Sequence, residues 1–111
     1  MLRYGYIKGH IVPSLDALIC ALCADYKRRE EMILSGDISV RTSAELRYLN
    51  YKIKNAISEV TAGYSVDTFI TDVGLRRGYA HSELEGMGEV LYKQTKTQIK
   101  ENIAKTLHLC D

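Results

Sequence analysis

The segment "TSAELRYLNYKIKNAISEV", residues 42–60, carries a clear amphipathic helical pattern. Its apolar residues recur at three- and four-residue steps and so share one helix face, while its charged residues fall largely on the other faces. This apolar stripe consists of Leu46, Leu49, Ile53, Ile57 and Val60. Thr42 and Glu45 have the spacing of a capping box, which predicts the helix start, and Gly63 stands where a left-handed cap would end it.

A second helical pattern precedes this segment. Pro13 and Ser14 mark its start, and we expect one helix from there to about Ile33, where "SGD", residues 35–37, supplies the stop. Its apolar positions are Leu15, Leu18, Ile19, Leu22 and Tyr26. Residues 1–12 are expected to form an N-terminal arm, with a short extended stretch at "YGYIKGHIV".

Two further helices are predicted after residue 63. Ser65 opens a short one, whose inward residues are Val66, Phe69, Ile70 and Val73. Ser82 and Glu85 form another capping-box pattern, which predicts a long last helix. Its stripe consists of Leu84, Leu91, Thr95, Ile99, Ile103 and Leu107. Gly86 and Gly88 weaken the first turns of this helix, because glycine costs about 1 kcal/mol in a helix interior.

These patterns predict the fold class. No segment alternates convincingly with the period of a strand, and a chain of 111 residues is the size of one domain. We therefore predict an all-α, four-helix bundle-like single domain over residues 1–111, with a helix-turn-helix near residues 66–100.

Composition restricts the function classes. The net charge is +1, so the chain lacks the overall basic excess of a strong nonspecific nucleic-acid binder. The apolar run over residues 17–24 is much shorter than the ~20 residues of a membrane span, and the N-terminus shows no signal-peptide pattern. We expect a cytoplasmic protein with reduced thiols, since its three cysteines are an odd number.

No catalytic arrangement is evident, and we predict that the protein is not an enzyme. The histidines are scattered, and Asp67 and Asp72 are interpreted as capping or solvated residues of the short helix. A zinc site formed by Cys20, Cys23, His108 and Cys110 is conceivable. The favoured interpretation is that the cysteines are small core residues, because the C-x-x-C lies inside a helical pattern. We predict no metal and no cofactor.

The helix-turn-helix hypothesis depends on spacing. Small Gly74 would let two helices approach, Gly78 would form the turn, and Leu84 and Met87 would anchor the second helix. The candidate DNA-binding residues are Arg76, Arg77, Lys93, Lys96 and Lys100. A stripe of this kind can neutralise several phosphates.

Acidic and aromatic residues in the same region favour a different partner. Glu83, Glu85 and Glu89 stand where a recognition helix would meet the DNA groove, and phosphate repels carboxylates. Tyr79 and Tyr92 belong to a set of eight tyrosines, and tyrosine is enriched at protein interfaces. These five residues are the candidate protein-binding set.

Two longer stretches carry a family resemblance: residues 25–60 and residues 76–109. The second contains Gly78-Tyr79, Ser82, Tyr92-Lys93, Lys96 and "IAKTLHL". It is similar to small prophage-encoded proteins of Firmicutes that resemble the ArpU and RinA type of phage late-gene regulator and the C-terminal helix-turn-helix domain of sigma factors. The resemblance implies phage transcription control, with the turn at residues 78–82 near DNA. This chain departs from the sigma-like pattern at Arg77, where a hydrophobic residue is usual.

Two functional hypotheses follow. The first is a non-enzymatic regulator from a phage or mobile element that contacts double-stranded DNA through the basic residues. The alternative is a protein interaction module, such as a small phage inhibitor of a host factor or defence system. The long last helix is also expected to support a homodimer, because its apolar stripe can exceed what one small core covers.

Overall fold

The computed structural model describes residues 10–110, and it is all-α and bundle-like, as predicted. Most of the predicted N-terminal arm lies outside the described residues. The elements are α1 (Pro13–Ala24), α2 (Tyr26–Ser35), α3 (Val40–Thr61), α4 (Val66–Gly74), the short 3-10 helix η1 (Tyr79–His81) and α5 (Glu89–Thr106). Within residues 10–110, no helix is long and apolar enough to cross a membrane.

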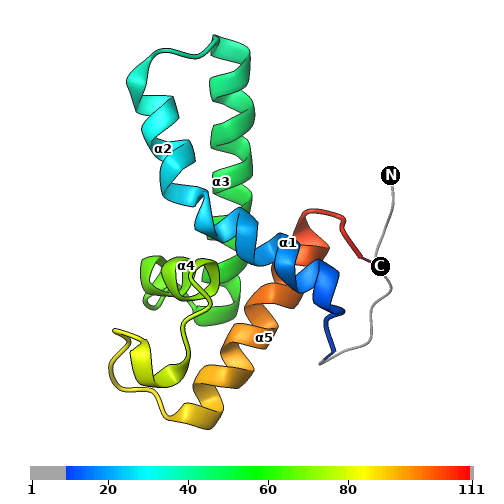
Figure 1. Ribbon diagram of the computed structural model, residues 1–111, viewed down its shortest axis with the longest axis vertical. Coiled ribbons are helices and arrows are strands. Elements are labelled where there is room, and N and C mark those ends of the chain that lie inside the picture. Colours follow the sequence, from blue (N-terminus) through cyan, green and yellow to red (C-terminus); the bar gives the residue numbers. More distant parts are fainter. Residues whose placement is uncertain (1–9, 111) are drawn as a thin grey trace.

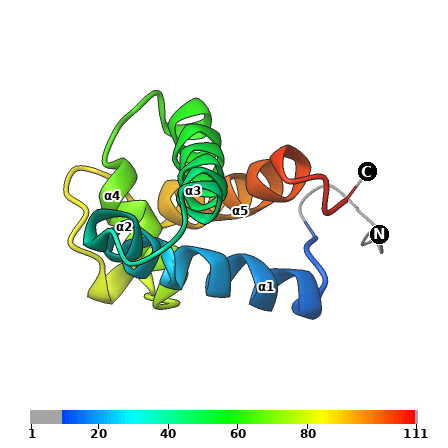
Figure 2. The same cartoon turned by 90° about the horizontal axis from the view of Figure 1, so that it is seen from above.

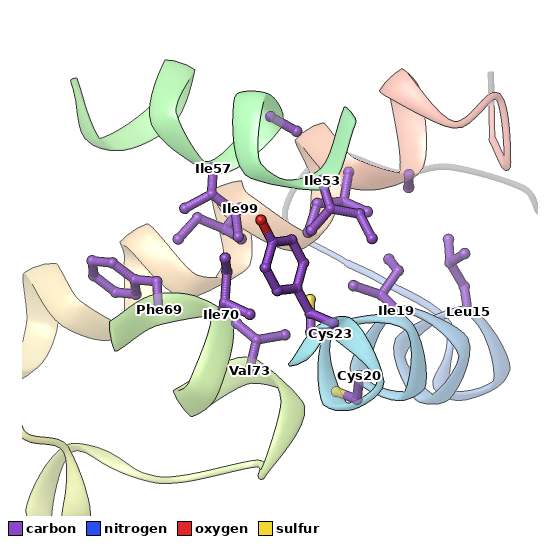
Figure 3. Packing of buried hydrophobic residues seen from close by; sticks show 14 of the residues in the cluster. Leu15, Ile19, Cys20, Cys23, Ile53, Ile57, Phe69, Ile70, Val73 and Ile99 are labelled. Atoms are coloured by element: carbon purple, nitrogen blue, oxygen red, sulfur yellow. The ribbon is translucent and has the colours of Figure 1, made fainter. Parts of the chain in front are cut away.

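The core lies where α1, α4, α5 and the second half of α3 meet (Figures 1 and 2). Ile19, Ile57, Phe69 and Ile99 are completely buried and come from all four of these helices (Figure 3). Two predicted inward faces are confirmed by buried residues. They are those of residues 42–60, at Ile53 and Ile57, and of the short helix after Ser65, at Phe69, Ile70 and Val73. Burial of this apolar surface is the main favourable contribution to folding.

The last helix is rotated relative to its predicted stripe. Thr95, Ile99 and Ile103 are buried as expected, but Leu91 is 54% exposed and Tyr92 is 1% exposed. Tyr92 takes the buried position that was predicted for Leu91, because its ring packs against Phe69, with ring centroids 5.9 Å apart. Most of the predicted stripe is therefore packed within the monomer, and a homodimer through this helix stays a prediction.

The prediction of one continuous first helix is wrong, since the helix breaks at Asp25. The Arg29 guanidinium donates across the break to the carbonyl oxygen of Leu22 and to Asn50 Oδ1. The Asn50 side-chain amide in turn donates to the carbonyl oxygen of Tyr26 at 3.2 Å. The bond to the Leu22 carbonyl supplies a partner for a backbone acceptor that the end of α1 leaves free.

Both predicted capping boxes are also wrong. α3 begins at Val40, and the Oγ of Ser39 caps it by accepting from the backbone N–H of Thr42 at 3.1 Å. Glu45 forms an exposed ion pair with Arg41 instead. The Ser82 box fails because residues 82–88 are not helical and α5 begins only at Glu89. The left-handed cap of α3 is Ala62, with φ of +53°, one residue before the predicted Gly63, which is also left-handed with φ of +81°.

The break at Asp25 sends α2 and the first half of α3 away from the core as a projecting pair of helices (Figure 1). We call residues 30–49, which include the ends of these helices and the turn between them, the α2–α3 hairpin. No residue of this hairpin is buried.

Candidate functional site at the α4–α5 loop

The predicted site residues lie on the connection between α4 and α5 and on α5 itself. We call residues 75–88 the α4–α5 loop; it contains η1 and lies at the end of the molecule opposite the hairpin (Figure 1). The tight turn of a helix-turn-helix is not formed, because this loop is far longer than the three or four residues typical of that motif. Gly74 does permit a close approach, but the backbone next to it belongs to Ala24.

A buried carboxylate anchors the loop to the core. Asp72 is completely buried, and its Oδ2 accepts hydrogen bonds from the hydroxyls of Ser82 at 2.5 Å and Tyr92 at 2.7 Å. The Ser82 Oγ also accepts from the backbone N–H of Leu84 at 3.0 Å. Within the described part of the chain, Asp72 Oδ1 has no hydrogen-bond partner. One carboxylate therefore joins α4, the loop and α5, so the interpretation of Asp72 as a solvated residue is wrong.

The Tyr92 hydroxyl is held in its protonated form at this anchor. Burial, followed by the hydrogen bond to Asp72, raises the pKa of Tyr92 to about 12. Removing its proton would place a second negative charge beside the buried carboxylate. Tyr92 therefore acts as a hydrogen-bond donor in the core, and its predicted role on a protein-binding surface is wrong.

Two other tyrosines hold the middle and the end of the loop. The Tyr79 hydroxyl donates to the carbonyl oxygen of Met87 at 2.9 Å, and its ring lies 5.5 Å from that of Tyr92. The Tyr64 hydroxyl, from the connection between α3 and α4, donates to the carbonyl oxygen of Glu85 at 2.7 Å. The first bond closes the loop on itself and the second ties it to the α3–α4 connection, so the loop is held along its length although most of it is irregular.

Three of the predicted DNA-binding residues are engaged within the molecule. Lys96 Nζ donates to the carbonyl oxygen of Arg77 at 2.6 Å and lies over the ring of Tyr92. Burial, and then the neighbouring charge of Lys100, lowers the pKa of Lys96. Lys100 pairs with Asp16 at 2.7 Å, and its side chain is only 20% exposed. Lys93 is exposed but pairs with Glu89 at 3.1 Å.

The two arginines occupy the start of the loop. Arg76 is exposed and has a left-handed backbone with φ of +54°. Arg77 is half-buried, and its backbone is bonded at both ends, with its N–H donating to the carbonyl oxygen of Asp72 at 2.9 Å. The five basic residues therefore do not form a continuous exposed stripe.

The acidic residues of the candidate protein-binding set, in contrast to the basic residues, are all exposed to solvent. Glu83, Glu85 and Glu89 are all exposed, and Tyr79 is 37% exposed beside them. The loop and the first turn of α5 thus present carboxylates to solvent on a fixed backbone. Carboxylates repel phosphate and attract cationic groups, and here they share the loop with Arg76 and Arg77 at its start.

The cysteines belong to the core. Cys20, Cys23 and Cys110 are buried, and burial raises the pKa of Cys23 to about 12, so its thiol stays protonated. His108 is exposed. Among the described residues, no group of three His, Cys, Asp or Glu side chains is placed to hold a metal ion.

Sequence reasoning missed the polar residues that organise the site. Asp72 lies three residues after Phe69, and Asn50 lies three residues before Ile53, so both fall on apolar helix faces. A polar residue within such a face must be paired to be buried at acceptable cost. The presence of Asp72 and Asn50 on apolar helix faces could therefore have indicated buried, hydrogen-bonded side chains, but it does not identify the residues that they bond to.

Comparisons of the chain with protein-family models, with curated proteins and with solved structures gave no match.

Proposed function

We propose that this chain is a non-enzymatic protein interaction module that presents the exposed carboxylates of Glu83, Glu85 and Glu89, on the α4–α5 loop and the first turn of α5, to a basic surface on another protein. The observation that carries the proposal is the buried Asp72 anchor, which fixes the loop while Glu83, Glu85 and Glu89 remain exposed.

Rigidity is what makes this loop suitable for recognition. A loop that must be ordered on binding loses side-chain and backbone entropy at that moment, which weakens the complex. Here the hydroxyls of Ser82, Tyr92, Tyr79 and Tyr64 already hold the loop before any partner arrives. Exposed carboxylates on a fixed backbone add charge complementarity, which raises the association rate and excludes acidic partners.

A DNA-associated regulator of a phage or mobile element is the second candidate. Arg76 and Lys93 are exposed, and the side chain of Lys93 is 69% accessible despite its pair with Glu89. The inward bonds of Lys96 and Lys100 leave fewer cations for phosphate than this function requires. The interaction module is therefore the better supported of the two, and a host factor or defence protein with a basic surface is the class of partner it fits.

The test is fluorescence-anisotropy binding of two probes across a salt series. One probe is a lysine- and arginine-rich peptide, and the other is a mixed-sequence DNA duplex. The loop variant combines Glu83→Gln, Glu85→Gln and Glu89→Gln, and its matched control combines Glu31→Gln, Asp37→Asn and Glu45→Gln on the hairpin. Both variants change the net charge equally.

We expect the peptide to bind and the loop variant to bind it roughly tenfold more weakly, with the control close to the wild type. An equal loss in both variants would show that only net charge matters, and would contradict a site at the loop. DNA binding that depends on Lys93 and Arg76, without peptide binding, would instead support the regulator.

A further inference from the structure

The α2–α3 hairpin exposes apolar side chains that no other part of residues 10–110 covers. Leu34 is 84% exposed, Val40 is 89% exposed and Tyr48 is 60% exposed. Ile33 and Ile38 are only half-buried. Isolated pairs of short helices are marginal in water without packing, so a hairpin of this kind normally buries its apolar side against something.

Leu34 and Val40, together with Ile33 and Ile38, line one groove that runs along the hairpin, whereas Tyr48 lies outside it. Two hollows share Ile33 and Arg47 in their walls and so form one surface. On α3 its wall includes Val40, Ala44, Arg47 and Tyr51, at steps of three and four residues that share one helix face. The groove therefore follows the full length of the hairpin from the tip to the base.

We propose that this groove is the interface of a two-fold symmetric homodimer, in which the hairpins of two copies pack against each other in antiparallel orientation. The charges in the groove identify the occupant as a second copy. Glu30 lies in the α2 wall and Arg47 lies in the α3 wall. Within residues 10–110, neither has an ion-pair partner.

A two-fold axis makes these charges self-complementary. When α2 of one copy packs on α3 of the other, Glu30 meets Arg47 of the second copy, and the symmetry repeats the pair. A foreign partner would need to supply both opposite charges in the same register, whereas a second copy carries them by construction. Apolar contacts of Leu34 and Val40 would fill the space beside these pairs.

The size of the hairpin sets the expected strength of the dimer. A ten-residue helix such as α2 is about 15 Å long, and two helices side by side are about 20 Å wide. The face is therefore smaller than the ~800 Å² per partner of a standard stable interface, and we expect a reversible, concentration-dependent dimer. This interface lies at the opposite end of the molecule from the α4–α5 loop, so each copy keeps its loop accessible (Figure 1).

The first test is sedimentation equilibrium of the full chain over a concentration series. The apolar variant combines Leu34→Glu with Val40→Glu, and its matched control combines Val90→Glu with Leu91→Glu, which are 71% and 54% exposed on α5. We expect the apolar variant to raise the dissociation constant by roughly 30-fold or more, because each copy loses two apolar contacts and gains two carboxylates at the interface. The control should dimerise as the wild type does, and circular dichroism should show both variants folded.

The second test is a charge exchange. Glu30→Arg and Arg47→Glu should each weaken the dimer roughly fivefold, and the double variant should restore it, because only opposite charges that face each other can be exchanged without loss. A chain that stays monomeric at every concentration would overturn the proposal, as would a dimer that the apolar variant leaves unchanged. Failure of the exchange to rescue dimerisation would overturn the antiparallel arrangement.

Discussion

The α2–α3 hairpin and the α4–α5 loop lie at opposite ends of the molecule and are held by opposite means (Figure 1). The hairpin is almost entirely helical but contains no buried residue. The loop contains only the short helix η1, yet side-chain hydrogen bonds hold it near its start, middle and end, through Lys96, the buried Asp72 and the loop's own Tyr79. Regular secondary structure and attachment to the core are therefore independent properties in this protein.

The two regions are ordered by different kinds of hydrogen bond. Helical hydrogen bonds are local, so the hairpin needs the core only at its base, where Arg29 and Asn50 are buried. An irregular loop leaves backbone groups without local partners, so its order must come from tertiary hydrogen bonds. Both regions start at one place, because Gly74 at the end of α4 abuts Ala24 at the end of α1.

Gly74→Ala should have the largest effect, since it affects the point from which both regions leave the core. A Cβ at this position would lie 2.7 Å from the backbone nitrogen of Ala24, so α1 and α4 would have to separate. We expect a loss of about 3 kcal/mol in the free energy of unfolding, measured by urea denaturation. Gly78→Ala is the control, because a Cβ there meets nothing within 4 Å. Equal stability of the two variants would contradict the close contact.

Arg29→Met should have the second-largest effect on stability and should destabilise mainly the hairpin. The variant keeps an aliphatic stem but leaves the Leu22 carbonyl and Asn50 without their donor, which should cost about 2–3 kcal/mol. Hydrogen exchange should show loss of protection in α2 and in the first half of α3. The exposed neighbour variant Arg28→Met should leave exchange unchanged. Equal loss of protection in the α4–α5 loop would show that the two regions are not held separately.

Tyr92→Phe should act mainly on the loop. It removes one of the two donors to Asp72 while keeping the ring in the core, and we expect a loss of about 1–2 kcal/mol. Limited trypsin digestion should become faster at Arg76 and Arg77, with little change on the hairpin. Tyr48→Phe, at a side chain that is 60% exposed, is the control and should digest as the wild type does.

The same variant should change the response to alkaline pH. The folded pKa of Tyr92 is about 12 against an ordinary value of 10.0, so between these values the folded state keeps a proton that the unfolded state loses. The stabilisation is therefore complete below pH 10.0 and is lost as pH rises toward 12. Cys23 contributes in the same direction from its ordinary value of 9.0. In urea denaturation across this range, Tyr92→Phe should show a shallower decline; a decline parallel to the wild type would contradict the assigned pKa.

Ser39→Ala should have the smallest effect on stability, and it tests whether Ser39 caps α3 at the tip of the hairpin. It removes the hydroxyl that caps α3, which is typically worth about 1 kcal/mol. Glu45→Ala removes only an exposed ion pair and should cost less than about 0.5 kcal/mol. If thermal denaturation ranked the two variants in the reverse order, the cap would belong to the predicted box and not to Ser39.

Much of the fold could be predicted because helix periodicity is a local property. Ile53, Ile57, Phe69 and Val73 were placed correctly from their spacing alone. The errors came at helix ends. Nothing local marks the break at Asp25, which depends on the Arg29 side chain and on Asn50 of another helix.

The candidate site was predictable in its location and only partly in its chemistry. Glu83, Glu85 and Glu89 are exposed as the protein-binding hypothesis requires, because charged residues remain in water unless they are paired. Lys96 was predicted to belong to an exposed basic stripe, but its Nζ donates a hydrogen bond to the carbonyl oxygen of Arg77. Spacing along a helix does not show which side chain finds a backbone partner in a loop.

The all-α fold and the core positions of Ile53, Ile57, Phe69 and Val73 follow from apolar repeats of three and four residues along the chain. Which polar groups are buried depends on how the helices pack against each other. Asp72 meets Tyr92 across twenty positions and Arg29 meets Asn50 across twenty-one. Burial of such groups is favourable only when a distant partner completes the hydrogen bond, so the physical reason lies in the packing of the whole chain.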